Sequence, residues 1–111
     1  MKDASSIRLG PSTPTGMTEV IVAHVYDVPL EEMRARTRGG PRAALARQVA
    51  MYLSHIVLGM SVTDVAAAFR RHRSTAHHAL HHIEELRDDP EIDRTLRFLE
   101  GMLVQAVEVR P

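Results

Sequence analysis

The feature that most constrains the fold is a long amphipathic segment in the middle of the chain, RAALARQVAMYLSHIVL at 42–58. Its larger apolar residues recur every three or four positions, at Leu45, Val49, Leu53 and Ile56. This spacing predicts a helix with one buried face. No segment alternates apolar and polar residues for long enough to predict a strand. The sequence therefore predicts an all-α fold with about five to six helices.

Two shorter helices are predicted before this segment. Thr18 is the expected N-cap of a first helix at 18–26. Its inward side chains would be Val20, Ile21, His24 and Val25. Pro29 at a first-turn position, followed by two glutamates, predicts a second helix at about 29–36. The segment TRGGP at 37–41 is predicted to be a loop, because Gly-Gly-Pro does not readily continue a helix.

Three more helices are predicted after the long segment. Ser61, with Asp64 three positions later, forms a capping box for a short helix that ends at Phe69. The basic run RRHR at 70–73 then leads into a helix that keeps four histidines away from its apolar side. That apolar side comprises Ala76, Ala79, Leu80, Ile83 and Leu86. A last helix, at about 90–107, has an apolar ridge of Ile92, Leu96, Leu99, Leu103 and Val107.

Charge is distributed unevenly along the chain, although the formal net charge is zero. Residues 33–83 contain eight arginines and one acid, Asp64, whereas 1–32 and 84–111 carry net charges of −3 and −4. Arginine suits bidentate contacts with phosphate and guanine. A run of like charge is also common on a solvated surface. The basic segment at 33–83 is therefore about equally consistent with binding of an anionic partner and with a charged surface that only faces solvent.

Composition excludes several classes of protein. There are no cysteines, so disulfides and thiolate zinc sites are absent. No apolar run approaches the roughly 20 residues that cross a bilayer, and we expect a cytoplasmic, nucleoid-associated protein without a membrane partner. Residues 1–16 are rich in Ser, Thr, Pro and Gly and are predicted to be a disordered tail. Residues 17–111 are predicted to form one helical domain.

The order of elements at 61–86 is that of a helix-turn-helix, whose second helix presents its first residues to the major groove. ARQVAMYLSHIVLGMSVTDVAAAF at 46–69, followed by STAHHALHHIEEL at 74–86, also resembles the DNA-binding domain of the bacterial replication initiator DnaA. That family carries an RQ-A-MYL helix, an S-x-x-x-[IV]-x-x-x-F helix and a G-R-D-H-T-T-V-x-H-A segment. The resemblance covers about 17–87, with one residue deleted after Phe69. It implies a Trp-repressor-like fold that binds double-stranded DNA.

The resemblance also implies which side chains contact DNA. Arg47 and Gln48 match a phosphate-contacting Arg-Gln pair, and residues 72–75 stand where the family reads bases. The family inserts a loop arginine into the minor groove, a role for which Arg38 or Arg42 is available here. The full set expected at the interface is Arg38, Arg42, Arg47, Gln48, Arg70, Arg71, His72, Arg73, Ser74, Thr75 and His78.

Differences from the family pattern predict a changed sequence preference. His72 replaces an aspartate that can accept from cytosine N4, and Arg73 adds a bidentate donor suited to guanine. We expect backbone binding to be kept and base reading to differ. The chain has no G-x-x-x-x-G-K-[ST] segment, so it is not expected to be an ATPase. It also has no cysteine and no recognisable Ser-His-acid arrangement, so we do not expect another enzyme. The expected role is control of replication initiation or of transcription, with no cofactor.

Two alternatives remain open. His77 with His81, and His78 with His82, are spaced to share a metal, but a site needs three or four ligands. A DnaA-like fold could also serve as a protein-interaction module for a replication or transcription protein. In the last helix, Met102, Leu103 and Val107 would either close the core or build a homodimer.

Overall fold

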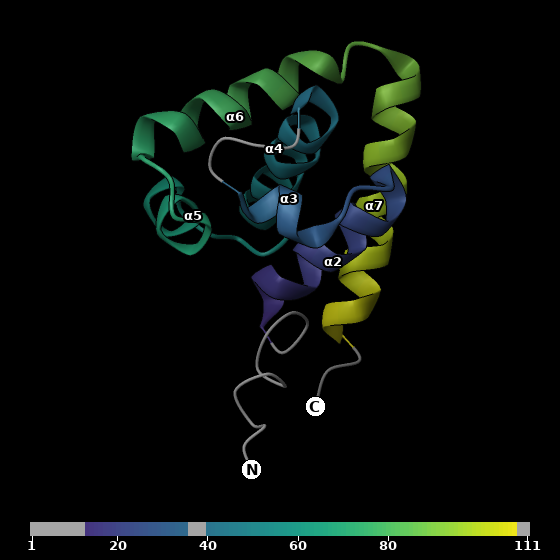
Figure 1. Cartoon of the computed structure of the whole chain (residues 1–111). Helices are drawn as coiled ribbons and strands as arrows, with labels where there is room; N and C mark the ends of the chain where they lie inside the picture. Colours follow the sequence, from purple (N-terminus) through teal and green to yellow (C-terminus); the bar gives the residue numbers. More distant parts are fainter. Residues whose placement is uncertain (1–12, 36–39, 109–111) are drawn as a thin grey trace.

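The computed structural model describes residues 13–35 and 40–108, and every regular element in those ranges is an α-helix. The six helices are α2 (Pro14–Tyr26), α3 (Leu30–Arg34), α4 (Gly40–Ile56), α5 (Val62–Phe69), α6 (Arg73–Leu86) and α7 (Pro90–Glu108). Helix α4 lies at the centre and contacts α2, α3, α5 and α6, while α7 packs along α2 (Figure 1). The predicted all-α helix-turn-helix fold is confirmed.

Two groups of buried side chains hold the helices together. The larger core joins α2, α4, α6 and α7 through residues such as Val22, Leu53, Ile83 and Leu96. The smaller core lies between α4, α5 and α6. Its buried members are Met51, Val65, Ala66, Ala76 and Ala79. Because three of these five are alanines, α5 and α6 can pack closely against the middle of α4.

The first helix begins four residues earlier than predicted. Thr13, not Thr18, is the N-cap: its Oγ1 accepts from the Gly16 N–H at 2.9 Å, and Pro14 occupies the first turn. Thr18 is fully buried and donates to the Pro14 carbonyl at 2.9 Å. Three of the sixteen residues predicted as tail therefore belong to α2, and residues 1–12 lie outside the described ranges.

The inward face of α2 also differs from the prediction. Val22 and Ala23 are buried, whereas Val20 is 37% exposed and His24 is exposed. Apolar residues occupy four consecutive positions at 20–23, so the sequence alone does not define which of them faces inward. Helix α2 packs against α4, α7 and α3, and this packing buries the side that carries Val22.

The start of α4 lies inside the segment that was predicted to be a loop. Gly40 has φ of +67°, a left-handed conformation that glycine adopts without strain, and Pro41 follows in the first turn. Gly-Pro therefore starts this helix instead of preventing it. The second helix is correspondingly shorter than predicted, with Pro29 as its N-cap and Arg34 as its last residue.

The later helices agree with the prediction. The Ser61 hydroxyl accepts from the Asp64 N–H at 3.1 Å, as expected of the cap of α5. The apolar side predicted for α6 is buried, with Leu86 partly so. Leu96, Leu99 and Leu103 of α7 are buried.

A network of charged groups joins α4, α6 and α7 around Arg87. Its guanidinium donates to Asp93 at 2.6 Å, to Glu100 at 2.5 Å and to the Tyr52 hydroxyl at 3.2 Å. The Tyr52 hydroxyl in turn donates to Glu84 at 2.5 Å. Burial lowers the pKa of Arg87, but the hydrogen bonds to Glu100, Tyr52 and Asp93 outweigh it and raise that pKa overall. The network thus connects the end of α6 to both α4 and α7.

Candidate nucleic-acid interface

Helix α5, the turn at 70–72 and helix α6 form the helix-turn-helix. The turn begins with Arg70 in the left-handed conformation, φ 57° and ψ 47°. The Arg71 N–H donates to the Ala66 carbonyl at 2.9 Å, and the Arg70 N–H donates to the Ala67 carbonyl at 3.2 Å. These bonds are those of a Schellman-type helix end, whose left-handed position is usually occupied by glycine. An arginine therefore occupies the place of the glycine that many turns of this kind contain.

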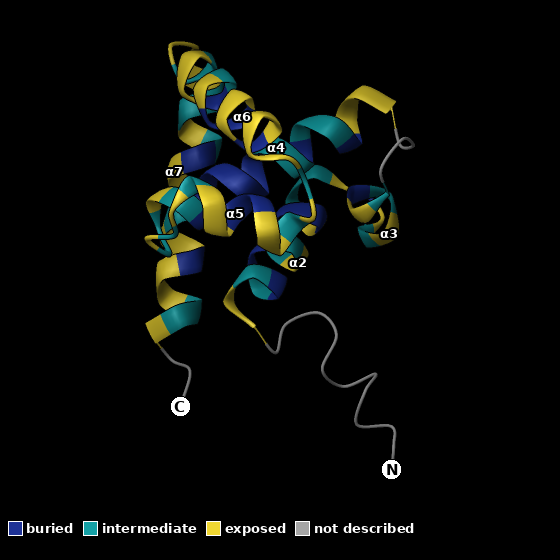
Figure 2. Cartoon of the chain, turned by 90° about the vertical axis from the view of Figure 1, so that its left-hand side faces the viewer, coloured by how far each residue is buried: buried dark blue, intermediate teal, exposed yellow. Residues whose placement is uncertain are grey.

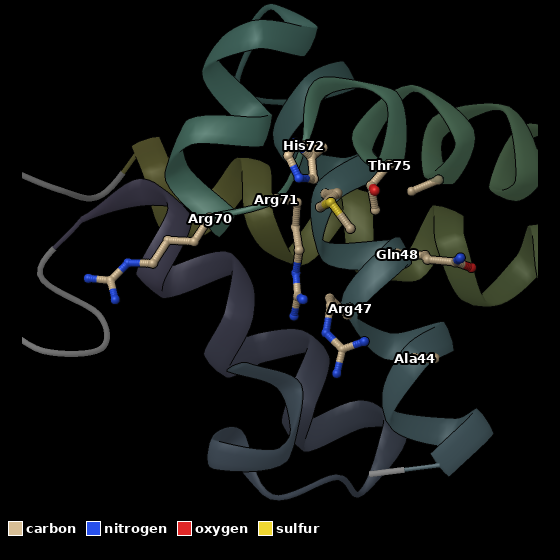
Figure 3. Close-up of a pocket in the computed structure, with 9 residues that line it drawn as sticks. Ala44, Arg47, Gln48, Arg70, Arg71, His72 and Thr75 are labelled. Atoms are coloured by element: carbon tan, nitrogen blue, oxygen red, sulfur yellow. The ribbon is translucent and has the colours of Figure 1, made fainter. Parts of the chain in front are cut away.

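A basic hollow of about 660 Å³ lies between α4 and the turn before α6 (Figure 3). Six of the eleven predicted interface residues line it: Arg47, Gln48, Arg70, Arg71, His72 and Thr75. The remaining lining residues are Ala44, Met51 and Ala79, so the lining contains three arginines and no acid. The hollow thus joins the Arg-Gln pair of α4 to the start of α6, which lie more than twenty positions apart in the sequence.

Two of the N–H groups of Arg47 make hydrogen bonds that stabilise the fold. Its Nε donates to the Met33 carbonyl at 2.7 Å, and its Nη2 donates to the Glu32 carbonyl at 3.0 Å. Both carbonyls belong to the last turn of α3, where the helix dipole is negative. The guanidinium has five N–H groups, and these two bonds leave donors on the side of the hollow.

Arg71 lies beside Arg47 and binds the same end of α3. Its Nη2 donates to the Ala35 carbonyl at 2.9 Å, while its Nε is buried without a hydrogen-bond partner. Partial burial, and then the positive charge of Arg71, lower the pKa of Arg47. Two guanidinium groups therefore share a space that contains carbonyl dipoles but no carboxylate.

The first turn of α6 is open to solvent. His72 is the N-cap residue, and its side chain makes no capping hydrogen bond. Arg73, Ser74 and Thr75 are all exposed, and no acid lies in this turn. A helix N-terminus with free N–H groups favours an anion, and here it lies beside the arginines of the hollow.

Four of the other five predicted residues lie at the surface. Arg73, Ser74 and His78 are exposed on α6, and Arg42 is exposed in the first turn of α4, but none of them lines the hollow. Arg38 lies outside the described residues. The sequence did not reveal that carbonyls of α3 and Ala35 bind two of the arginines, because backbone acceptors leave no trace in residue type.

The histidines of α6 form two neighbouring pairs. The rings of His77 and His81 lie edge to face with centroids 4.7 Å apart, and those of His78 and His82 are parallel at 6.0 Å. Across 13–35 and 40–108, no three His, Asp or Glu side chains are grouped closely enough to hold a metal ion. Over the same ranges, no helix is long and apolar enough to cross a membrane.

Comparisons with known proteins agree with this geometry. Residues 19–83 match the family model described as the bacterial DnaA protein helix-turn-helix. The chain is 30% identical over 89 residues to the chromosomal replication initiator protein DnaA of Pseudothermotoga lettingae, covering 75% of this chain and 20% of that protein. It is 33% identical over 82 residues to the DnaA of Aquifex aeolicus, covering 74% of this chain and 20% of that protein.

A solved structure shows the same fold. The crystal structure of a DNA replication initiation factor matches with a TM-score of 0.75 at 29% identity, covering 83% of this chain and 28% of the other. The chain spans about a fifth of the length of the relatives that it matches. The family match covers α4, α5 and the part of α6 that carries the hollow. This chain therefore belongs to the family of bacterial DnaA helix-turn-helix domains.

Proposed function

We propose that this chain binds double-stranded DNA through α6 and the basic hollow beside it, and that it acts in the control of replication initiation or of transcription. The observation that carries the proposal is the hollow itself: three arginines and a helix N-terminus meet there without an acid. Such a surface attracts phosphate strongly. These residues need no bound nucleotide to bind phosphate. Binding to DNA would place the protein in the nucleoid.

The proposed contacts divide into two kinds. Gln48 and Arg70, with the remaining donors of Arg47, would bind phosphates and set the orientation of the domain. The exposed residues at 72–75 would reach base edges in the major groove. His78 lies one turn further along α6 and would contact the adjacent strand. Arg42 in the first turn of α4, or Arg38 four positions before it in the sequence, would contact the minor groove.

The test is binding of the full chain to a random-sequence duplex as a function of salt. The three phosphate-binding residues named above predict a slope of about −2.7 in log K against log[salt], or roughly a 40-fold loss between about 50 and 200 mM salt. Undetectable or salt-independent binding would overturn the proposal. It would favour the alternative, in which the fold serves as a protein-interaction module.

Matched arginine variants separate the two kinds of contact. Arg73→Ala is expected to change which sequences are selected from a random library, because it removes a donor suited to guanine. Arg97→Ala is the control, since that exposed arginine lies on α7 and pairs only with Asp93 within the described residues. If Arg73→Ala left the selected sequences unchanged, α6 would not read bases through this residue.

A further inference from the structure

Helix α7 has an outward face that no described part of the chain covers. Buried and exposed residues alternate along this helix, as they do when only one face is packed (Figure 2). On the uncovered side, Phe98 is 59% exposed, Val104 is 41% exposed and Met102 is 36% exposed. Of the three residues for which core closure and dimerisation were both left open, Leu103 is buried and Val107 packs against the core, whereas Met102 is exposed.

Gly101 lies at the centre of this face. A Cβ added at this position would meet nothing within 4 Å, so the fold of a single chain does not require a glycine there. Glycine inside a helix is destabilising relative to alanine. It does allow the backbone of a second helix to approach closely. Its presence among exposed apolar side chains fits a helix that packs against another helix.

We propose that this face binds a second copy of the chain, with the two α7 helices antiparallel about a two-fold axis at Gly101. Arg94 lies seven residues before Gly101 and Glu108 seven residues after it, on the same exposed side. Seven residues make about two turns, or roughly 10.5 Å. The two-fold axis therefore brings each Arg94 opposite Glu108 of the partner subunit.

The same axis brings the apolar residues together. Phe98 and Val104 are each three positions from Gly101, so they meet across the antiparallel pair. A parallel pair would instead place Arg94 against Arg94 and Glu108 against Glu108, which is unfavourable. In the described ranges, the salt bridges include neither Arg94 nor Glu108. Both charges are thus available to select the antiparallel arrangement.

The position of α7 makes such a pair compatible with DNA binding. Helix α7 joins the end of α6 that is opposite to the helix-turn-helix turn (Figure 1). Pairing through its outward face leaves the hollow and the first turn of α6 open in both copies. One face of a 19-residue helix is small, so the dimer belongs to the weak class that buries less than about 1,200 Å².

A charge-swap experiment tests the pairing without DNA, so its failure is distinct from failure of the proposed DNA binding. Sedimentation equilibrium of the full chain from about 1 to 500 μM should show a monomer–dimer equilibrium. Arg94→Glu and Glu108→Arg should each weaken dimerisation about tenfold, because each creates two repulsive pairs by symmetry. The double variant should restore the original dissociation constant. A double variant as weak as the single ones would overturn the antiparallel register.

Gly101→Ala separates dimerisation from folding. Alanine should raise the melting temperature by about 2–5 °C because it favours the helix, yet it should weaken the dimer several-fold by holding the two helices apart. Phe98→Lys should abolish association. A chain that stays monomeric to about 500 μM would overturn the proposal, as would association that Phe98→Lys leaves unchanged. A monomeric chain is also the expected result if another segment of the same chain covers the outward face of α7.

Discussion

Arginines that are partly buried occur in two regions of the molecule, and their partners differ. Beside α6, Arg47 and Arg71 donate to the carbonyls of Glu32, Met33 and Ala35. At the other end of α6, Arg87 donates to the carboxylates of Asp93 and Glu100. Carbonyl dipoles hold a guanidinium in place but leave its charge uncancelled, whereas carboxylates cancel it. The first region can therefore attract an anion, and the second contributes only to folding.

The two regions also differ in the net shift of the arginine pKa, although burial lowers that pKa in both. The pKa of Arg47 is lowered first by burial and then by its neighbour Arg71, and no carboxylate lines the hollow to offset either effect. The pKa of Arg87 is raised, because its partners stabilise the charged form. Net charge alone does not distinguish a region that can bind an anion from one that only stabilises the fold. The hydrogen-bond partners of each arginine make that distinction.

The largest effect is expected from Arg87→Ala. It leaves Glu100 without its cation, leaves Asp93 with only the exposed Arg97, and removes a partner of Tyr52. Breaking a fully buried pair costs about 3–5 kcal/mol. Since both carboxylates are 26% exposed, we expect about 2 kcal/mol in the free energy of unfolding, measured with urea. The DNA affinity of the folded variant should not change. A large loss of affinity would contradict the view that the Arg87 region contributes only to folding.

Arg47→Ala is expected to affect both folding and binding. Loss of two charge-assisted hydrogen bonds at a partly exposed site should cost about 1.5 kcal/mol of stability. Affinity for all duplexes should fall about tenfold, and the salt slope should decrease by about one unit, because one phosphate contact is lost. Arg97→Ala serves as the control for both readings. An unchanged salt slope would mean that Arg47 has only a structural role.

The sequence predicted the helices better than it predicted their ends. Periodic apolar residues defined α4, α6 and α7 because the buried side chains of a helix repeat every three or four positions. The ends of α2 and α4 depend on single residues, Thr13 and Gly40, that lie in segments rich in Pro and Gly. Such segments start helices as well as interrupt them, and only the packing of the following residues decides between the two.

The candidate site was predicted by residue type but not by arrangement. A resemblance at fixed spacings named six of the nine residues that line the hollow. It did not reveal that Arg71 and Arg47 share the end of α3, since their acceptors are backbone carbonyls. The network at Arg87 was missed because its members, Tyr52, Glu84 and Glu100 among them, lie on three helices.

The smallest expected effect comes from substituting glycine at two residues that have nearly the same backbone conformation. Asp27 at the end of α2 has φ 56° and ψ 51°, and Arg70 at the end of α5 has φ 57° and ψ 47°. In both, the following N–H donates to a carbonyl five positions back at 2.9 Å. A left-handed conformation is unfavourable for an L-residue, less so for aspartate. The two positions thus differ mainly in side chain and in location.

Glycine at each position tests what the side chain does. Arg70→Gly should raise the free energy of unfolding by about 0.5–1 kcal/mol, and Asp27→Gly by less, because relief of backbone strain exceeds the added entropy of the unfolded chain. If the side chain of Arg70 contacts phosphate, Arg70→Gly should at the same time bind duplex DNA several-fold more weakly, with a shallower salt slope. Asp27→Gly should leave binding unchanged. If Arg70→Gly gained stability and kept its affinity for DNA, the strained conformation of Arg70 would bring no benefit in binding. Phosphate binding in the basic hollow would then be due to Arg47, Gln48 and Arg71 alone.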